Sequence, residues 1–444
     1  MSDAPSAPEP TTARVTPVPH RGISLTVLIV NQLLAGVGVA SGIAVAALLV
    51  DELTGVVALA GFAQSSSVLG AAIAAIPLAK LAVGRGRHVA LATGYALGCL
   101  GAVLVIVAAV SGFVPLVFLG LMAFGAGTAA GLQARFAATE VAAPGFEARS
   151  MSLVLWATTL GSVAGPLLSD LGDTVGQAIG LPALVGPFLF SGAAFAFSAL
   201  LVAALLRLPQ AGRLASDAGA DEASPTPTGA AGAGGASKPI GSWQAMRIAA
   251  RNPRALFAIL AIVCSQTVMV GVMVMTPVHM MAHGLSLTAV GVVLSIHIVG
   301  MYGASPIVGW LADRIGSERV IFIGIGVLAA ATLIGILAPA DDMLLVPLAL
   351  GLLGLGWSCG LIGGSTLVTD SVSQEIRVPL QGATDAAMNL SAAVAAALSG
   401  FVLGLGGFAG VCLVGALVLL PLVVAGLRAR ARARVSSEPR EPAS

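Results

Sequence analysis

The sequence predicts an all-α membrane protein, because of its composition, the length of its apolar runs and the placement of its charges. Of the 444 residues, 57% are hydrophobic and 9% are charged, and the mean hydropathy is +1.00. A soluble domain averages about 25% charged residues, so the composition excludes an ordinary soluble protein. A bilayer accommodates such a chain at about 20 apolar residues per helix. The alternating segments of about ten residues that β-barrel strands would show are missing from the sequence.

Twelve apolar runs of spanning length divide the chain into two groups of six. The first group covers 23–50, 56–79, 89–110, 115–138, 151–171 and 184–206, and the second covers 255–278, 287–311, 319–338, 344–368, 384–404 and 408–427. The first run follows a polar stretch without a small-residue cleavage site, so we expect a retained helix and not a signal peptide. The pattern predicts twelve transmembrane helices in two six-helix bundles.

The basic residues give the expected orientation, because Lys and Arg accumulate on the cytoplasmic side of a membrane. With a cytoplasmic N-terminus, all 21 Lys and Arg fall in cytoplasmic segments. The outer loops then carry only acids, which are Asp51, Glu52, Asp170, Asp173, Asp341 and Asp342. We therefore expect both termini in the cytoplasm and a multi-pass protein of a bacterial-type cytoplasmic membrane.

The segments outside the runs give the domain organisation. The segment between the two bundles is rich in Ala, Gly, Ser and Pro at its centre, which is typical of a flexible linker. It ends in Ser242–Arg247, where an aromatic residue mixed with a base favours a short interfacial helix. The expected domains are a disordered tail (1–20), an N-terminal bundle (21–206), a cytoplasmic linker (207–253), a C-terminal bundle (254–428) and a basic tail (429–444).

The loop after the eighth run carries a motif. It reads Gly309-Trp310-Leu311-Ala312-Asp313-Arg314-Ile315-Gly316-Ser317-Glu318-Arg319. This loop resembles the G-x-x-x-D-R-x-G-R-R loop of the major facilitator superfamily, in which an acid and arginines at helix ends latch neighbouring helices. In the first bundle, Lys80 stands where the acid is expected. The resemblance covers essentially the whole chain and implies two bundles that rock about a midplane site. The alternative is that both loops only set topology.

In the fifth run, Gly161, Gly165 and Pro166 form a G-x-x-x-G-P sequence similar to that of the superfamily's proton antiporters. Two interpretations stay open: a close helix contact with a proline kink, or a part in proton antiport. Asp385 is the acid in the spans that is a candidate to cycle a proton. The uncharged polar residues that either line a cavity or bond between helices are Asn31, Gln32, Gln64 and Asn389.

The seventh and eighth runs concentrate soft metal ligands. Met269 and Met273 share a face of one helix, and His297 and Met301 share a face of the next. Thioethers and imidazoles together suit copper, particularly Cu(I). Methionine pairs on apolar helices also pack as flexible gap-fillers, so packing is the alternative.

This M-x3-M and H-x3-M pattern resembles the CcoA-type copper importers of the superfamily. The resemblance implies that the four residues form a path for copper, which would be a transported ion and not a cofactor. At the outer mouth, His279 and His283 are candidates for capturing the ion.

The sequence therefore predicts a secondary active transporter that works by alternating access and imports copper. The alternative is a proton-coupled transporter of a small organic molecule, either a drug efflux pump or a vitamin or metabolite importer. A membrane sensor or scaffold is a third class, but the sequence has no soluble signalling domain. It also has no ATP-binding motif and no catalytic constellation. We therefore expect no enzyme activity, no cofactor, no nucleic-acid partner, and a monomer in the bilayer.

Overall fold

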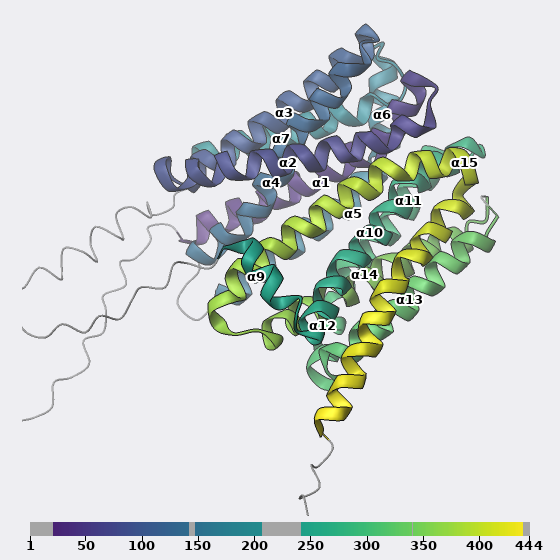
Figure 1. Cartoon of the computed structure of the whole chain (residues 1–444). Helices are drawn as coiled ribbons and strands as arrows, with labels where there is room; N and C mark the ends of the chain where they lie inside the picture. Colours follow the sequence, from purple (N-terminus) through teal and green to yellow (C-terminus); the bar gives the residue numbers. More distant parts are fainter. Residues whose placement is uncertain (1–20, 142–146, 207–240, 340, 438–444) are drawn as a thin grey trace, which may run out of the picture.

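A computed structural model describes residues 21–141, 147–206, 241–339 and 341–437, so the predicted tail (1–20) and the centre of the linker lie outside the described residues. The N-terminal half contains α1 (Arg21–Thr54), α2 (Val57–Arg85), α3 (Arg87–Ser111), α4 (Val114–Val141), α5 (Glu147–Leu167), α6 (Ser169–Ala178) and α7 (Gly186–Leu205). The C-terminal half contains α9 (Ser242–Ala249), α10 (Pro253–Ala282), α11 (Leu287–Ile298), the π-helical turn η1 (Val299–Gly303), α12 (Ser305–Ile315), α13 (Ser317–Leu337), α14 (Leu345–Ser371) and α15 (Gln374–Ser437). The two halves lie side by side (Figure 1).

Within the described residues, ten helices are long and apolar enough to cross a membrane. One of the ten is the continuous segment of α11, η1 and α12. Another is α15, which is two helices, because Gly407 (φ 62°, ψ −169°) turns the chain between them. The helix α5 coincides with the predicted fifth run without being one of the ten. The predicted interfacial helix is present as α9.

The short helix α6 differs from the sequence prediction, which continued the fifth run to residue 171. The helix α5 ends at Leu167 instead, and α6 then packs against the start of α7. A Cβ atom at Gly186, the first residue of α7, would overlap the Gly172 carbonyl of α6. Asp173 accepts a 2.6 Å hydrogen bond from the backbone N–H of Leu184, whose φ is 65°. The polar, Gly-containing sequence of α6 has no spanning run, so the hydropathy pattern could not predict it.

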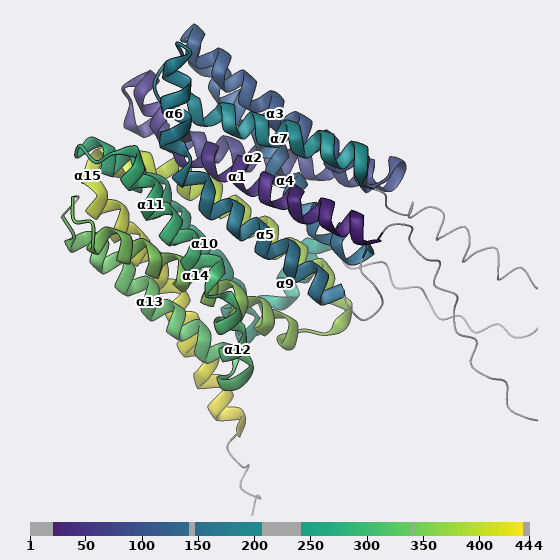
Figure 2. The same cartoon turned by 180° about the vertical axis from the view of Figure 1, so that it is seen from behind.

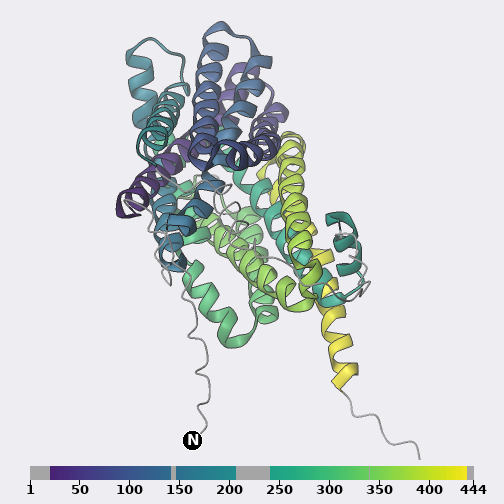
Figure 3. The same cartoon turned by 90° about the vertical axis from the view of Figure 1, so that its left-hand side faces the viewer.

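The two halves contact each other toward one end of the bundle (Figures 2 and 3). The Ser65 hydroxyl on α2 donates a 2.6 Å hydrogen bond to the Ala393 carbonyl on α15. The Ser295 hydroxyl on α11 donates a 2.8 Å hydrogen bond to the Val163 carbonyl on α5. These contacts lie in the first half of α2, the second half of α5, the first half of the continuous α11–η1–α12 segment and the second half of the α15 helix before Gly407. That is the side on which the predicted outer loops carry acids.

Glycines let the helices within each half approach backbone to backbone, as is typical of membrane bundles. A Cβ atom at Gly70 of α2 would overlap the backbone of Met122 on α4. In the opposite direction, a Cβ atom at Gly125 of α4 would overlap the Ser67 carbonyl on α2. The α2–α4 contact therefore requires glycine on both helices.

We predict that Gly70→Ala destabilises the protein, because the new methyl group meets rigid backbone and not a movable side chain. Overpacking of this kind costs about 1–3 kcal/mol, so the melting temperature in detergent should fall. The matched control is Gly326→Ala in α13, where nothing lies within 4 Å of the new Cβ. Equal melting temperatures for both variants would contradict the close α2–α4 contact.

Candidate transport site

A buried network of neutral polar groups crosses the N-terminal half. Asn31 Nδ2 donates to the Tyr95 hydroxyl at 2.9 Å, and that hydroxyl donates to Gln32 Oε1 at 3.1 Å. Gln32 Nε2 donates to the Gly131 carbonyl at 3.1 Å and to Thr158 Oγ1 at 2.9 Å. The network thus joins α1, α3, α4 and α5. It lies roughly 12–16 Å from the helix ends opposite the contact between the halves, at 1.5 Å per residue.

Asn31 and Gln32 both bond between helices, which is one of the two interpretations given for them, while a place at a cavity stays a prediction. Tyr95 was missed by the sequence analysis, although it is one of only two tyrosines and lies in an apolar run. Its ring stacks near Phe195 with the centroids 6.2 Å apart. Asn31 Oδ1 is buried and has no hydrogen-bond partner among the described residues. The network therefore keeps one free acceptor for a donor group.

A second neutral cluster lies in the C-terminal half. The Trp357 indole N–H on α14 donates a 2.5 Å hydrogen bond to Gln266 Oε1 on α10. The Tyr302 ring in η1 meets the Trp357 ring edge-on, with the centroids 5.7 Å apart. Tyr302 is 43% exposed while Trp357 is 6% exposed. All three residues lie roughly 20 Å from the same helix ends, close to the middle of the bundle. The sequence analysis missed them, although single aromatic and amide residues in apolar runs are a visible signal.

His297 is fully buried where α11 passes into the π-helical turn. Its Nδ1 lies 2.8 Å from the Leu350 carbonyl on α14, and because a carbonyl only accepts, Nδ1 carries the proton. His297 Nε2 has no hydrogen-bond partner among the described residues. Met301 follows inside the turn and packs against Gly354 of α14. Single π-helical turns inside α-helices occur frequently at functional sites.

Met269 and Met273 lie on α10, which also packs on α14. Ser265, one helical turn before Met269, contacts Gly360 of α14, so Met269 continues the face that points toward that helix. Met269 is buried and Met273 is half-buried. The two predicted donor pairs therefore share α14 as a neighbour.

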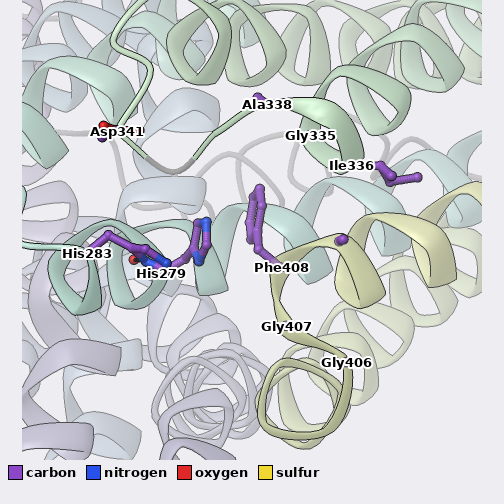
Figure 4. A pocket seen from close by; sticks show the side chains of 10 residues that line it. His279, His283, Gly335, Ile336, Ala338, Asp341, Gly406, Gly407 and Phe408 are labelled. Atoms are coloured by element: carbon purple, nitrogen blue, oxygen red, sulfur yellow. Dashed lines mark hydrogen bonds between the residues drawn. The ribbon is translucent and has the colours of Figure 1, made fainter.

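The side chains of His279 and His283, predicted at the outer mouth, contact each other. The rings of His279 and His283 have their centroids 4.5 Å apart, at the end of α10. They line a cavity with the loop after α13 and the turn of α15 (Figure 4).

The remaining predicted polar residues lie on the helices that join the halves. Gln64 on α2 is half-buried beside Ser65. Asp385 and Asn389 are exposed on α15, and Asn389 Nδ2 donates to the Asp385 carbonyl one turn earlier at 2.9 Å.

Comparison with known proteins follows this geometry. The family model described as Major Facilitator Superfamily matches residues 27–375 and, in a second match, residues 258–444. The chain belongs to the major facilitator superfamily. It is a transporter and not an enzyme, and a multi-pass protein of the bacterial cytoplasmic membrane.

Two relatives come from Bacillus subtilis. The uncharacterized MFS-type transporter YdeG is 36% identical over 90% of this chain and 91% of its own length, and YddS is 36% identical over 90% of each. The riboflavin transporter RfnT of Brucella anthropi is 30% identical over 80% of this chain and 84% of its own length. Among solved structures, the nucleoside transporter NupG superposes with a TM-score of 0.68 at 16% identity, covering 92% and 98% of the chains. At this identity the likeness concerns the fold alone.

The superfamily loop after the eighth span forms a tight turn at Gly316 (φ 90°), as predicted. Asp313 is exposed, and the guanidinium of Arg314 lies 5.1 Å from the Trp310 ring centroid. The ion pair that the described part of this loop shows is instead between Glu318 and Arg254 at the start of α10, at 2.7 Å. Glu318 stands where the motif has an arginine, so the motif did not predict it as a residue that pairs helix ends. A latch through Asp313 stays a prediction.

The G-x-x-x-G-P sequence forms a close helix contact, which is one of the two interpretations given for it. A part in proton antiport stays a prediction. Cβ atoms at Gly161 and Gly165 would overlap the backbone and side chains of α1. The Ser41 hydroxyl on α1 donates to the Gly165 carbonyl at 2.9 Å. The Pro166 carbonyl faces Gly291 of α11, so the same stretch also contacts the other half.

We predict that Tyr95→Phe lowers the melting temperature, because it leaves the buried Asn31 amide and Gln32 carbonyl short of a partner. Such a loss costs about 1–3 kcal/mol. Replacing both partners by apolar groups is milder, so Asn31→Leu/Tyr95→Phe should lose less than the sum of the two single variants. Strictly additive losses would show that the pair is not coupled.

Proposed function

We propose that this superfamily member has twelve membrane crossings with both termini in the cytoplasm and transports its solute by alternating access. The one-sided distribution of Lys and Arg supports this orientation. The division of α15 at Gly407 and the position of α5 add two crossings to the ten apolar helices. In this orientation, the halves contact each other on the outer side, and the described state is the inward-facing one.

We infer that the solute is an uncharged organic molecule with an aromatic ring, of the riboflavin type. The observation that supports this most is the pair of neutral clusters, one in each half, which lie roughly 12–16 Å and roughly 20 Å from the same helix ends. The Asn31 amide keeps an acceptor without a partner among the described residues, and the Gln266 amide carries two N–H donors. The exposed ring of Tyr302 offers a stacking surface. The similarity to the riboflavin transporter RfnT supports the same solute class.

Proton coupling is part of this proposal. The acid assigned to it is Asp385, which is exposed on α15. The G-x-x-x-G-P stretch contributes by fixing α5 between α1 and α11, not by carrying the proton.

We predict that the wild-type protein restores riboflavin uptake in a riboflavin-requiring strain that lacks its own importer. Tyr302→Leu removes the stacking surface, so apparent affinity should fall roughly 2- to 10-fold, the value of an aromatic pair. Tyr302→Phe keeps the ring and is the matched control. Uptake at the level of empty vector, with normal protein in the membrane, would refute riboflavin as the solute.

Copper import is the second candidate, and His297 is the observation that favours it. Its Nδ1 proton is held by the Leu350 carbonyl, which leaves Nε2 with a lone pair for a ligand. Metal-binding histidines commonly donate their other ring N–H to a backbone carbonyl in this way. Counted from the outer ends of α10 and α11, Met273 and His297 lie at a similar depth of about 14–15 Å. Met269 and Met301 continue the path inward.

Met269→Leu separates ligation from packing, since it keeps volume and hydrophobicity and removes the sulfur. Such swaps usually cost less than about 1.5 kcal/mol of stability. If copper is the cargo, uptake of the ion at low external concentration should fall severely while membrane abundance stays normal. Unchanged copper accumulation in Met269→Leu/Met273→Leu would eliminate this candidate and leave the organic solute.

A further inference from the structure

The outer end of the C-terminal half contains a cavity of about 490 Å³ that the transport proposal does not use. It is an open cavity lined by the end of α10, the end of α13, Ala338 and Asp341 after α13, and the turn of α15 at Gly407 (Figure 4). Its titratable lining residues are His279, His283 and Asp341. Two imidazoles and a carboxylate in one cavity are donor types that bind transition metals.

The two imidazole rings contact each other, with their centroids 4.5 Å apart and their planes at 62°. The His279 ring stacks flat on Phe408, with the centroids 4.6 Å apart and the planes 7° apart, so its edge remains accessible. His283 Nδ1 lies 2.8 Å from the His279 carbonyl and donates to it, which leaves His283 Nε2 free as an acceptor. Histidines four residues apart share one helix face, and this spacing binds zinc in other helices.

The surroundings favour a cation. The pair lies in the last turn and at the C-cap of α10, where the helix dipole places partial negative charge. Asp341 adds a carboxylate to the cavity wall. The next residue, Asp342, fixes this loop to the start of α14, since its Oδ1 accepts from the backbone N–H groups of Leu344 (2.8 Å) and Leu345 (2.9 Å). Those hydrogen bonds, first from Leu345 and then from Leu344, hold the pKa of Asp342 below its ordinary value.

We propose that His279 and His283 chelate a divalent transition-metal ion of the zinc class at this outer cavity, with water completing the coordination. Within the described chain, no third His, Cys, Asp or Glu is close enough to complete a three-ligand set as the side chains lie. The site therefore exchanges its ion readily with the outside. It differs from the midplane thioether path, because imidazoles without sulfur suit Zn(II), Cu(II) or Ni(II) better than Cu(I). The capture of copper expected from the sequence would use the same pair, whereas the binding of Zn²⁺ itself does not depend on which solute is transported.

The test is to titrate tag-free, full-length protein in detergent with Zn²⁺. Binding is measured by calorimetry and by the change in melting temperature. We expect one ion per chain in the wild type. His279→Gln and His283→Gln should each weaken binding at least about tenfold, since even outer-shell partners of a metal cost 10- to 100-fold. The matched control is His88→Gln, which removes a histidine at the opposite end of the bundle and should bind like the wild type.

Two outcomes would overturn the proposal: a wild type that binds no Zn²⁺ up to millimolar concentration, or a double variant that binds like the wild type. Melting temperatures without metal show whether each variant is folded, and His279→Phe is a second variant that keeps an aromatic ring beside Phe408. Riboflavin uptake in metal-free buffer should be equal in the wild type and the histidine variants. If riboflavin is not transported, the Zn²⁺-binding result still stands. If Zn²⁺ does not bind, the riboflavin-uptake result still stands.

Discussion

The structure depends on the close approach of helix backbones at glycine. In a bilayer every backbone N–H and C=O must be bonded within the chain, which restricts the spans to helices. Without a hydrophobic force between helices in lipid, close packing at small residues and hydrogen bonds hold them together. The helix α5 combines both contributions, because Gly161 and Gly165 bring it against α1 and the carbonyl groups near Pro166 meet Ser41 of α1 and Ser295 of α11. One short stretch thus fixes a helix within its own half and against the other half.

The same constraint explains how the halves can both hold together and separate. Their contacts combine glycine–carbonyl approaches, the edge-to-face pair of Phe62 and Phe401, and serine hydroxyls such as Ser65 on Ala393 and Ser295 on Val163. Each of these hydrogen bonds contributes about 0.5–1.5 kcal/mol net. The polar part of this contact is therefore weak. Buried networks such as Asn31–Tyr95–Gln32 lie within one half and can move with it as a rigid unit.

The superfamily loop also shows that a sequence motif can predict local geometry without predicting which side chains pair. In the superfamily loop, Gly316 makes the turn that its motif predicts, but the ion pair is made by Glu318 and Arg254 and not by Asp313. A tight turn depends on local φ and ψ, which one glycine sets. An ion pair depends on which helix end is nearest in the state described. The M-x3-M and H-x3-M pairs are a second example. Both lie on helices that pack on α14, but the spacing alone does not decide whether they bind an ion.

The sequence by itself determined the apolar helices and the turn at Gly316, because hydropathy, chain length and positive φ are local properties. It also indicated Asn31, Gln32, His279 and His283, since polar residues are conspicuous in apolar runs. Only the tertiary structure decided their partners. Tyr95 joins Asn31 and Gln32 across 64 and 63 residues of sequence, respectively, and Gln266 meets Trp357 across 91. Helix α6 and the Glu318–Arg254 pair likewise required the packed structure. The physical reason is that hydropathy places a residue in the membrane, whereas the rotation of each helix about its axis decides which side chain it meets.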